Sequence, residues 1–283
     1  MKNKINLLIC LGISVFSLSV PLTAFAGTVG NTGGADTLRG TGIFSLKKTS
    51  NIPIETAIDA DIIFARDLSA EGATNASIKE SQWYMVRLGY RMFDRIEPYV
   101  RLGGAHLKAK WTDSASAQKI EMDTSSGFAW GLGLKALLFD IKNPRIKIIG
   151  DGSYRTTDLD PHKGYFNAEA TGIDKNNSKF VIREWQVALL AATEMDLSAI
   201  KGRSETLKGY KLCPYAGVKY SDVSARIRMV ASGATYYPNN IESDRKFGIV
   251  TGLDLTGDDN IAVNVEGRFI DETAVSAGVS ALF

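Results

Sequence analysis

Apolar and polar residues alternate along most of the chain with a period of two, which is typical of β-strands with two different faces. Between Ile54 and Phe64 the alternation holds over eleven positions, and a second run covers 84–92. The pattern predicts ten strands, each near the ~9–11 residues that a tilted membrane strand needs. The other eight runs begin near Pro98, Phe128, Ile146, Trp185, Leu212, Phe247, Ile261 and Thr273.

The connections between these runs alternate in length. Short turns on one side and long loops on the other are typical of outer-membrane barrels. Two connections depart from this order, since 196–209 is too long for the short side and 271–272 too short for the long side. The expected short turns, marked by Asp, Asn, Pro or Gly, are 93–97, 139–144 and 256–259, and the expected long loops are 67–80, 112–125, 156–179 and 229–243.

Aromatic residues on the apolar faces gather at the strand ends nearest the long loops. Amphipathic rings favour the headgroup level of a membrane, so girdles of this kind indicate a transmembrane barrel. A soluble β-sandwich also alternates, but it has no reason to sort aromatic residues by strand end. The sorted residues are Phe64, Tyr84, Phe128, Trp130, Tyr154, Trp185, Phe247 and Phe269, with Tyr90 and Phe283 at the opposite ends.

The faces opposite the apolar ones carry charges of both signs, which a barrel would point into its lumen. Because hydrocarbon cannot satisfy an open sheet edge, the sheet must close on itself. We expect the basic residues of strands two to five to face the acidic residues of strands six, eight and nine across the axis. The predicted lumen charge network is Asp59, Asp61, Arg87, Arg91, Arg101, Lys135, Lys147, Asp151, Glu184, Glu194, Lys219, Asp254, Glu266 and Arg268.

The expected fold class is therefore all-β: a closed antiparallel up-and-down transmembrane barrel over 52–283, with about ten strands and eight or twelve as alternatives. Both chain ends would lie on the periplasmic side. Residues 27–51 form a Gly- and Thr-rich lead-in segment.

The first 26 residues predict a secretory signal peptide. Lys2 and Lys4 precede an apolar stretch, and Ala24-Phe25-Ala26 fits the small-x-small cleavage pattern. The mature chain would hold 257 residues with 31 basic and 31 acidic ones, so charge gives no footprint for nucleic acid. Its single Cys213 excludes an internal disulfide and a Cys-based metal site, and no cofactor is expected.

The last segment, 272–283, ends in Phe283 with Val275, Ala277, Val279 and Ala281 on one face. It resembles the closing strand of bacterial outer-membrane barrels, in architecture the small OmpA- or OmpX-type barrels. This resemblance implies that Phe283 is part of the signal read by the barrel-assembly machinery. Ala281 departs from the bulky residue that those barrels prefer at the third position from the end.

Few residues of the chain are candidates for catalysis. Omptin-like surface proteases use acidic pairs and a His–Asp dyad, and Asp158, Asp160 and His162 share one expected loop. A loop rich in Asp is more often simply solvated, so we expect no enzyme. A metal role for His106 would need partners that the sequence does not place nearby.

These patterns predict an integral barrel of the Gram-negative outer membrane, either structural or a narrow, porin-like channel with a charge-filled lumen. A surface adhesion protein acting through long extracellular loops is the alternative, and an omptin-like hydrolase is the second. The expected partners are outer-membrane lipid and the barrel-assembly machinery. The oligomeric state stays open, with a monomer expected.

Deleting Phe283 is expected to lower the folded, heat-modifiable fraction of the protein in cells, because this residue completes the lipid-facing register of the last strand. Gel mobility of unheated membrane samples measures that fraction. An unchanged membrane yield would contradict this role.

Overall fold

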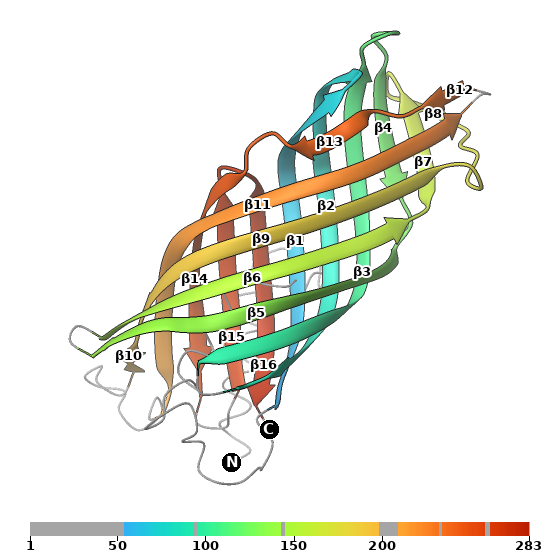
Figure 1. The fold of residues 1–283 in the computed structure, drawn as a ribbon. Helices are drawn as coiled ribbons and strands as arrows, with labels where there is room; N and C mark the ends of the chain where they lie inside the picture. Colours follow the sequence, from blue (N-terminus) through green and yellow to red (C-terminus); the bar gives the residue numbers. More distant parts are fainter. Residues whose placement is uncertain are drawn as a thin grey trace.

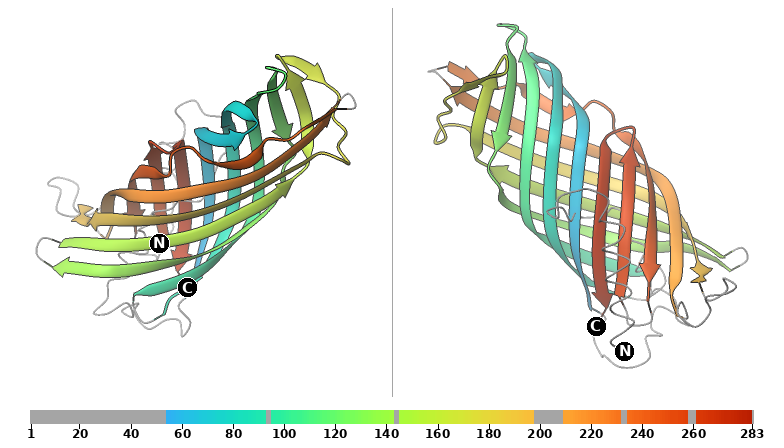
Figure 2. Two further views of the ribbon diagram at one scale, coloured as in Figure 1. Left: turned by 45° about the horizontal axis from the view of Figure 1, so that its top comes forward. Right: turned by 180° about the vertical axis from the view of Figure 1, so that it is seen from behind.

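The computed structural model describes residues 54–92, 95–142, 145–197, 209–231, 234–257 and 261–282. The predicted signal peptide, the lead-in segment and Phe283 lie outside these residues. The described residues form one sixteen-stranded antiparallel sheet that curls into a tilted barrel (Figures 1 and 2). Among them, no helix is long and apolar enough to cross a membrane.

Ten strands form a closed ring, which confirms the predicted count. Closure comes from pairing of the first and last strands, from Glu55 opposite Leu282 to Ala65 opposite Thr273. In ring order the strands are β1 (Ile54–Glu71), β2 (Ala73–Tyr90), β3 (Ile96–Asp113), β5 (Gly127–Lys142), β6 (Arg145–Leu159), β9 (Lys179–Thr193), β11 (Lys211–Ala231), β14 (Phe247–Thr256), β15 (Ile261–Phe269) and β16 (Thr273–Leu282).

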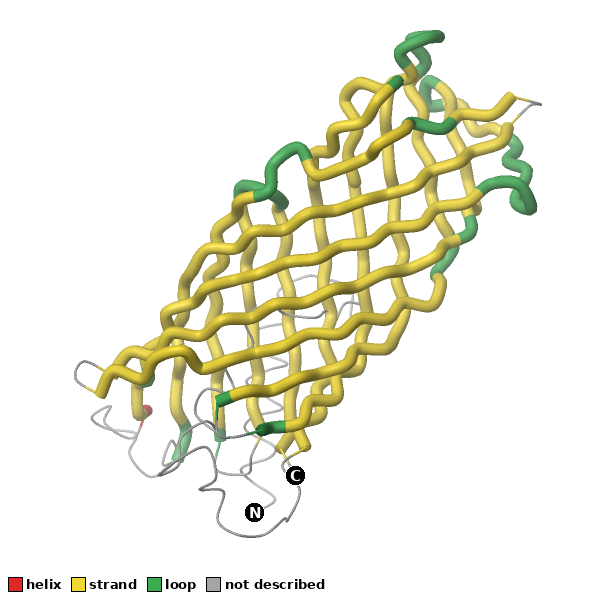
Figure 3. The backbone as a smooth tube through the Cα atoms, in the orientation of Figure 1, coloured by secondary structure: helices red, strands yellow, loops and turns green. Residues whose placement is uncertain are grey.

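The connections expected to be long loops are largely β-structure, so that part of the prediction is wrong. β1 runs on to Glu71 and β2 begins at Ala73, with only Gly72, at φ 76°, between them. At the upper end the loop segments lie at the tips of the strands, and a few short loop segments lie at the lower end (Figure 3). The remaining short strands are β4 (Lys119–Thr124), β7 (Pro161–Phe166), β8 (Glu169–Thr171), β12 (Ala234–Tyr236) and β13 (Asn239–Ser243) at this end, and β10 (Met195–Asp196) at the other.

A change in which face is apolar explains why these strand extensions resemble loops in the sequence. In the lower part of β9, Glu184 is buried in the lumen while Trp185 is exposed on the outside. In the upper part, Phe180 is buried and Arg183 is exposed. The period of two continues through the strand, but the apolar face passes from the outside to the inside. A strand that is predicted from its outward-facing apolar residues therefore ends too early, at the position where the apolar face changes sides.

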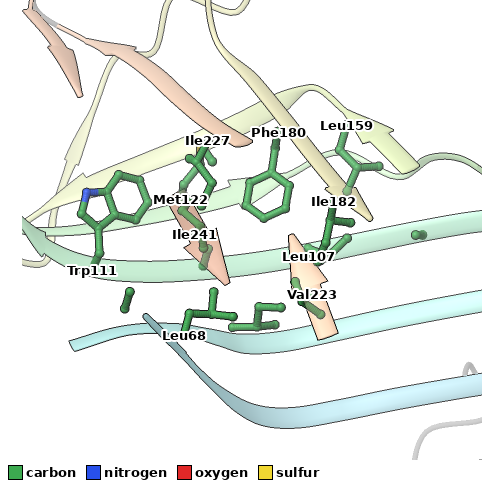
Figure 4. Close-up of a cluster of buried hydrophobic side chains, with 14 of the residues drawn as sticks. Leu68, Leu107, Trp111, Met122, Leu159, Phe180, Ile182, Val223, Ile227 and Ile241 are labelled. Atoms are coloured by element: carbon green, nitrogen blue, oxygen red, sulfur yellow. The ribbon is translucent and has the colours of Figure 1, made fainter. Parts of the chain in front are cut away.

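The upper lumen is packed with apolar side chains. Trp83, Leu107, Met122 and Phe180 are all at most 1% exposed and come from four separate strands, β2, β3, β4 and β9. Figure 4 shows side chains of this cluster meeting between the strands. The upper end of the barrel is therefore filled with apolar side chains, like the core of a soluble β-protein.

Below this core, large apolar side chains cover the outside of the barrel. Ile58, Leu132 and Val218 are each more than half exposed, and exposed large apolar residues occur on nine of the ten ring strands. On the tenth, β6, Ile146 and Ile148 are half-buried. Soluble monomers rarely expose a continuous surface of this kind, and a closed ring leaves no unpaired edge for hydrocarbon to meet. The chain is an integral β-barrel of the outer-membrane type.

An aromatic row marks the upper border of this apolar surface. The rings of Trp185 and Tyr220 lie 5.0 Å apart, those of Tyr220 and Phe247 also 5.0 Å apart, and those of Trp130 and Tyr154 5.8 Å apart. These five residues come from five successive strands, β5, β6, β9, β11 and β14. The row fits the predicted girdle, and Tyr220 is a member that the prediction lacked.

Leu189→Arg is expected to destabilise the barrel by about 2–4 kcal/mol, because it places a cation on the lipid face below the aromatic row. Val181→Arg is the matched control, since it lies on the same face of β9 but above that row. Equilibrium unfolding in lipid vesicles measures both free energies. Equal losses would show that the membrane border has been placed wrongly.

Candidate functional site in the barrel lumen

The middle of the lumen is crossed by ion pairs centred on Arg66 of β1. Its guanidinium donates to Glu184 of β9, to Glu272 at 3.3 Å and to the hydroxyl of Ser221 at 2.6 Å. β1 and β9 are five strands apart in either direction around the ring, so they form opposite walls. The Arg66–Glu184 pair therefore spans the lumen.

Arg155 makes a second contact across the lumen. Its guanidinium lies 2.6 Å from Asp61 of β1 and 2.6 Å from Glu184 on the neighbouring strand. The same group stacks over the ring of Trp83, 4.3 Å from the centroid. A desolvated guanidinium over an aromatic face is favourable, so Trp83 joins the ion pairs to the apolar core above them.

Two carboxylates from the turn before β16 complete this middle layer. Lys219 pairs with Glu272 and lies 2.8 Å from Asp271, while Arg268 pairs with Asp61 and lies 2.7 Å from Glu272. We call this set the central cluster. It balances four bases against four acids: Arg66, Arg155, Lys219 and Arg268 with Asp61, Glu184, Asp271 and Glu272.

A second set of ion pairs lies along one wall and does not cross the lumen. Arg87 lies 2.6 Å from Glu55, and Arg91 donates to both Glu55 and Glu97. Lys135 lies 3.8 Å from Glu97. Because β1, β2, β3 and β5 are successive strands, this wall cluster ties neighbours together.

Smaller polar groups line the rest of the bore. Tyr99 donates to Asp151 at 2.8 Å, with Arg101 over its ring at 4.8 Å. On the far wall Tyr215 donates to Glu266 at 2.9 Å, and the amide of Asn264 donates to Tyr215 at 3.0 Å and to Asp254. Lys147 and Glu194 pair at 3.2 Å.

All fourteen residues of the predicted network face the interior, and thirteen of them are at most 4% exposed. The side chain of Glu194 is 6% exposed. The expected opposition of a basic and an acidic wall is wrong for Arg87 and Arg91, which pair with carboxylates of adjacent strands. The long contacts across the lumen come from Arg66 and Arg155 instead.

Sequence reasoning missed Glu55, Arg66, Glu97, Arg155, Asp271 and Glu272. Glu55, Glu97 and Arg155 are each four residues from a predicted lumen residue of the same strand, namely Asp59, Arg101 and Asp151, and so share its inward face. Extending the period of two along each strand would have found them. Arg66 follows a register shift between Ile63 and Ala65, which turns the even-numbered positions inward. No sequence signal marks that shift.

The candidate catalytic residues lie on the outer surface. Asp158, Asp160 and His162 line a hollow of about 990 Å³, where Asp158 pairs with Lys179 at 2.6 Å. The structure also brings His106 to within 2.8 Å of Asp123, a pair that the sequence placed in separate segments. Among the described residues, no group of three or more His, Cys, Asp or Glu could hold a metal ion.

No family model and no curated protein matches this chain. Solved structures that are similar in shape include three bacterial outer-membrane proteins or domains. They are the outer membrane protease OmpT from Escherichia coli (9% identity, covering 83% of this chain and 99% of that chain, TM-score 0.42), the translocator domain of autotransporter NalP from Neisseria meningitidis (11%, 92% and 98%, 0.42), and the beta domain of the Bordetella autotransporter Brka (10%, 82% and 100%, 0.43). At these identities and TM-scores the likenesses carry no argument, and the architecture rests on the chain's own strand pairing and outer surface.

Glu184→Gln is expected to destabilise the folded barrel by about 3–5 kcal/mol, because Arg66 and Arg155 would both lose a buried counter-charge. Asp158→Asn is the control, since it breaks an exposed pair and should cost about 0–1 kcal/mol. Denaturant unfolding in lipid vesicles measures both variants. A loss for Glu184→Gln no larger than for the control would mean that the central cluster adds little stability.

Proposed function

We propose that this chain is a structural outer-membrane barrel whose lumen is closed by its own side chains. The observation that carries the proposal is the Arg66–Glu184 pair, which joins opposite walls with side-chain exposures of 0% and 2%. A water-filled bore would leave the side chains that line it exposed. Any conduction would be limited to small solutes.

The size of the ring supports this proposal. Barrels of about eight strands have interiors that side chains fill, whereas aqueous channels are typical of 16–18 strands. Ten strands lie near the filled end of that range. The apolar core above the central cluster adds a second barrier of different chemistry, because ions do not enter a dry apolar layer.

A second candidate function is adhesion or another surface interaction at the upper end. The strand extensions there have their own buried core, so they would present the outer tips on a rigid support. A binding role would use these tips and leave the lumen closed. The two candidates are compatible in one molecule.

The proposal includes no catalysis. On the outer face Asp158 is bound to Lys179, and Nδ1 of His162 lies 3.3 Å from the ammonium of Lys175. Each of these two groups is therefore in contact with a lysine on the outer surface. The proposal also includes a monomer inserted by the barrel-assembly machinery.

Planar-bilayer recording tests the closed lumen. The wild-type protein is expected to show no stable porin-sized steps, and the double variant Arg66→Ala/Arg155→Ala is expected to raise the leak because both contacts across the lumen are lost. Arg87→Ala is the control, since Arg87 pairs only along one wall. Heat-modifiable gel mobility shows that each variant is folded.

Large, stable steps from the wild-type protein would overturn the proposal and favour a channel. A leak that rises equally in the control would show that contacts across the lumen are not what closes it.

A further inference from the structure

Exposed cations gather on the outside of β9 and β11, above the aromatic row. We call Lys179, Arg183, Arg226 and Arg228 the basic patch. Strand pairing places Lys179 opposite Arg228, and Arg226 lies opposite Val181, between the levels of Lys179 and Arg183. All four basic side chains are exposed on the outward face. The patch is therefore one continuous surface made by two paired strands.

The depth of the patch is set by the aromatic row. Arg183 is two residues above Trp185 on the same face of β9, a separation of about 6.6 Å along the strand. Trp185 itself packs against Tyr220 of β11. Since the headgroup layer is about 5–8 Å thick on each side of the hydrocarbon, Arg183 lies at headgroup depth and Arg226 lies farther out.

Two hollows of about 990 and 560 Å³ adjoin the patch, and both are lined by Asp158, Lys179 and Arg226. The carboxylate of Asp158 is bound by Lys179 at 2.6 Å, and that of Glu242 by Lys246 at 3.1 Å. Within the described part of the chain, neither Arg183 nor Arg226 takes part in an ion pair. The hollows therefore offer guanidinium donors with room for a ligand beside them.

The opposite wall at the same height carries no such excess. Lys108 donates to Glu80 at 2.8 Å, and Lys79 lies 2.7 Å from Glu121. The hydrogen bond from Lys108 lowers the pKa of Glu80 below its usual value, so this carboxylate stays charged and neutralises its partner. The positive surface is thus local to β9 and β11.

We propose that the basic patch binds the phosphate group of anionic lipid headgroups in the outer leaflet. A guanidinium can donate two parallel hydrogen bonds to a phosphate. The guanidinium groups of Arg183 and Arg226 lie beside the hollows. Trp185 and Tyr220 lie directly below, where the acyl chains of the same lipid would pack against their rings. The site therefore recognises both parts of a phospholipid.

Native mass spectrometry of the barrel in detergent, with phosphatidic acid and phosphatidylcholine of equal chain length, tests this proposal. The wild-type protein is expected to bind phosphatidic acid in preference. Arg183→Gln/Arg226→Gln is expected to weaken that binding roughly fivefold for each cation removed. The control Lys110→Gln/Lys119→Gln removes two exposed charges from β3 and β4 and should leave binding unchanged.

Ser224→Asp is a second variant that keeps both arginines and places a carboxylate opposite Arg183. It should also weaken phosphatidic acid binding, and it replaces the double variant as the test if that variant does not fold. Equal affinity in the wild-type and patch variants would overturn the proposal. Full competition by inorganic phosphate at the concentration of the lipid would overturn the assignment to a lipid, because free phosphate has no chain to contact Trp185.

Discussion

Hydrocarbon cannot hydrogen-bond, and this constraint orders the whole molecule. Where lipid surrounds the wall, every polar group must turn inward, so β9 points Glu184 to the lumen and Trp185 outward. Where water surrounds the wall, the preference reverses, and the same strand points Phe180 inward and Arg183 outward. A single continuous ladder of backbone hydrogen bonds serves both environments. Only the assignment of the two faces changes along it.

The inward turn of the charges creates a second problem, because isolated ions are costly to bury. The central cluster solves it with equal numbers of bases and acids whose contacts reach across the ring. The wall cluster solves it locally, between neighbouring strands. These two solutions differ in geometry, since only the first one has contacts that reach across the bore. In the closed barrel that we propose, closure of the lumen is a by-product of neutralising charge between facing walls.

Strand number, ring closure and the inward faces of the lower strands could be predicted from the sequence because a period of two fixes which residues share a face. The same count would have reached Glu55 and Arg155. It could not reach Arg66, since a register shift reverses parity just before that residue. Nor could it recognise Asp271 and Glu272, whose short turn folds its carboxylates into the lumen, a position set by packing of distant strands. The upper strand extensions were missed because their apolar face lies inside.

The reversal of faces also bears on how the molecule enters its membrane. The outward side of the upper strand extensions is polar and charged, and this part must travel across the hydrocarbon to reach the far side. Each cation exposed to lipid at the midplane costs about 2–4 kcal/mol. Translocation with the basic patch facing lipid would therefore add the free-energy cost of several cations at once. A route that shields this surface avoids that barrier. We therefore expect the feature that gives the barrel a rigid outer end to slow spontaneous insertion, which favours the assisted insertion that we propose.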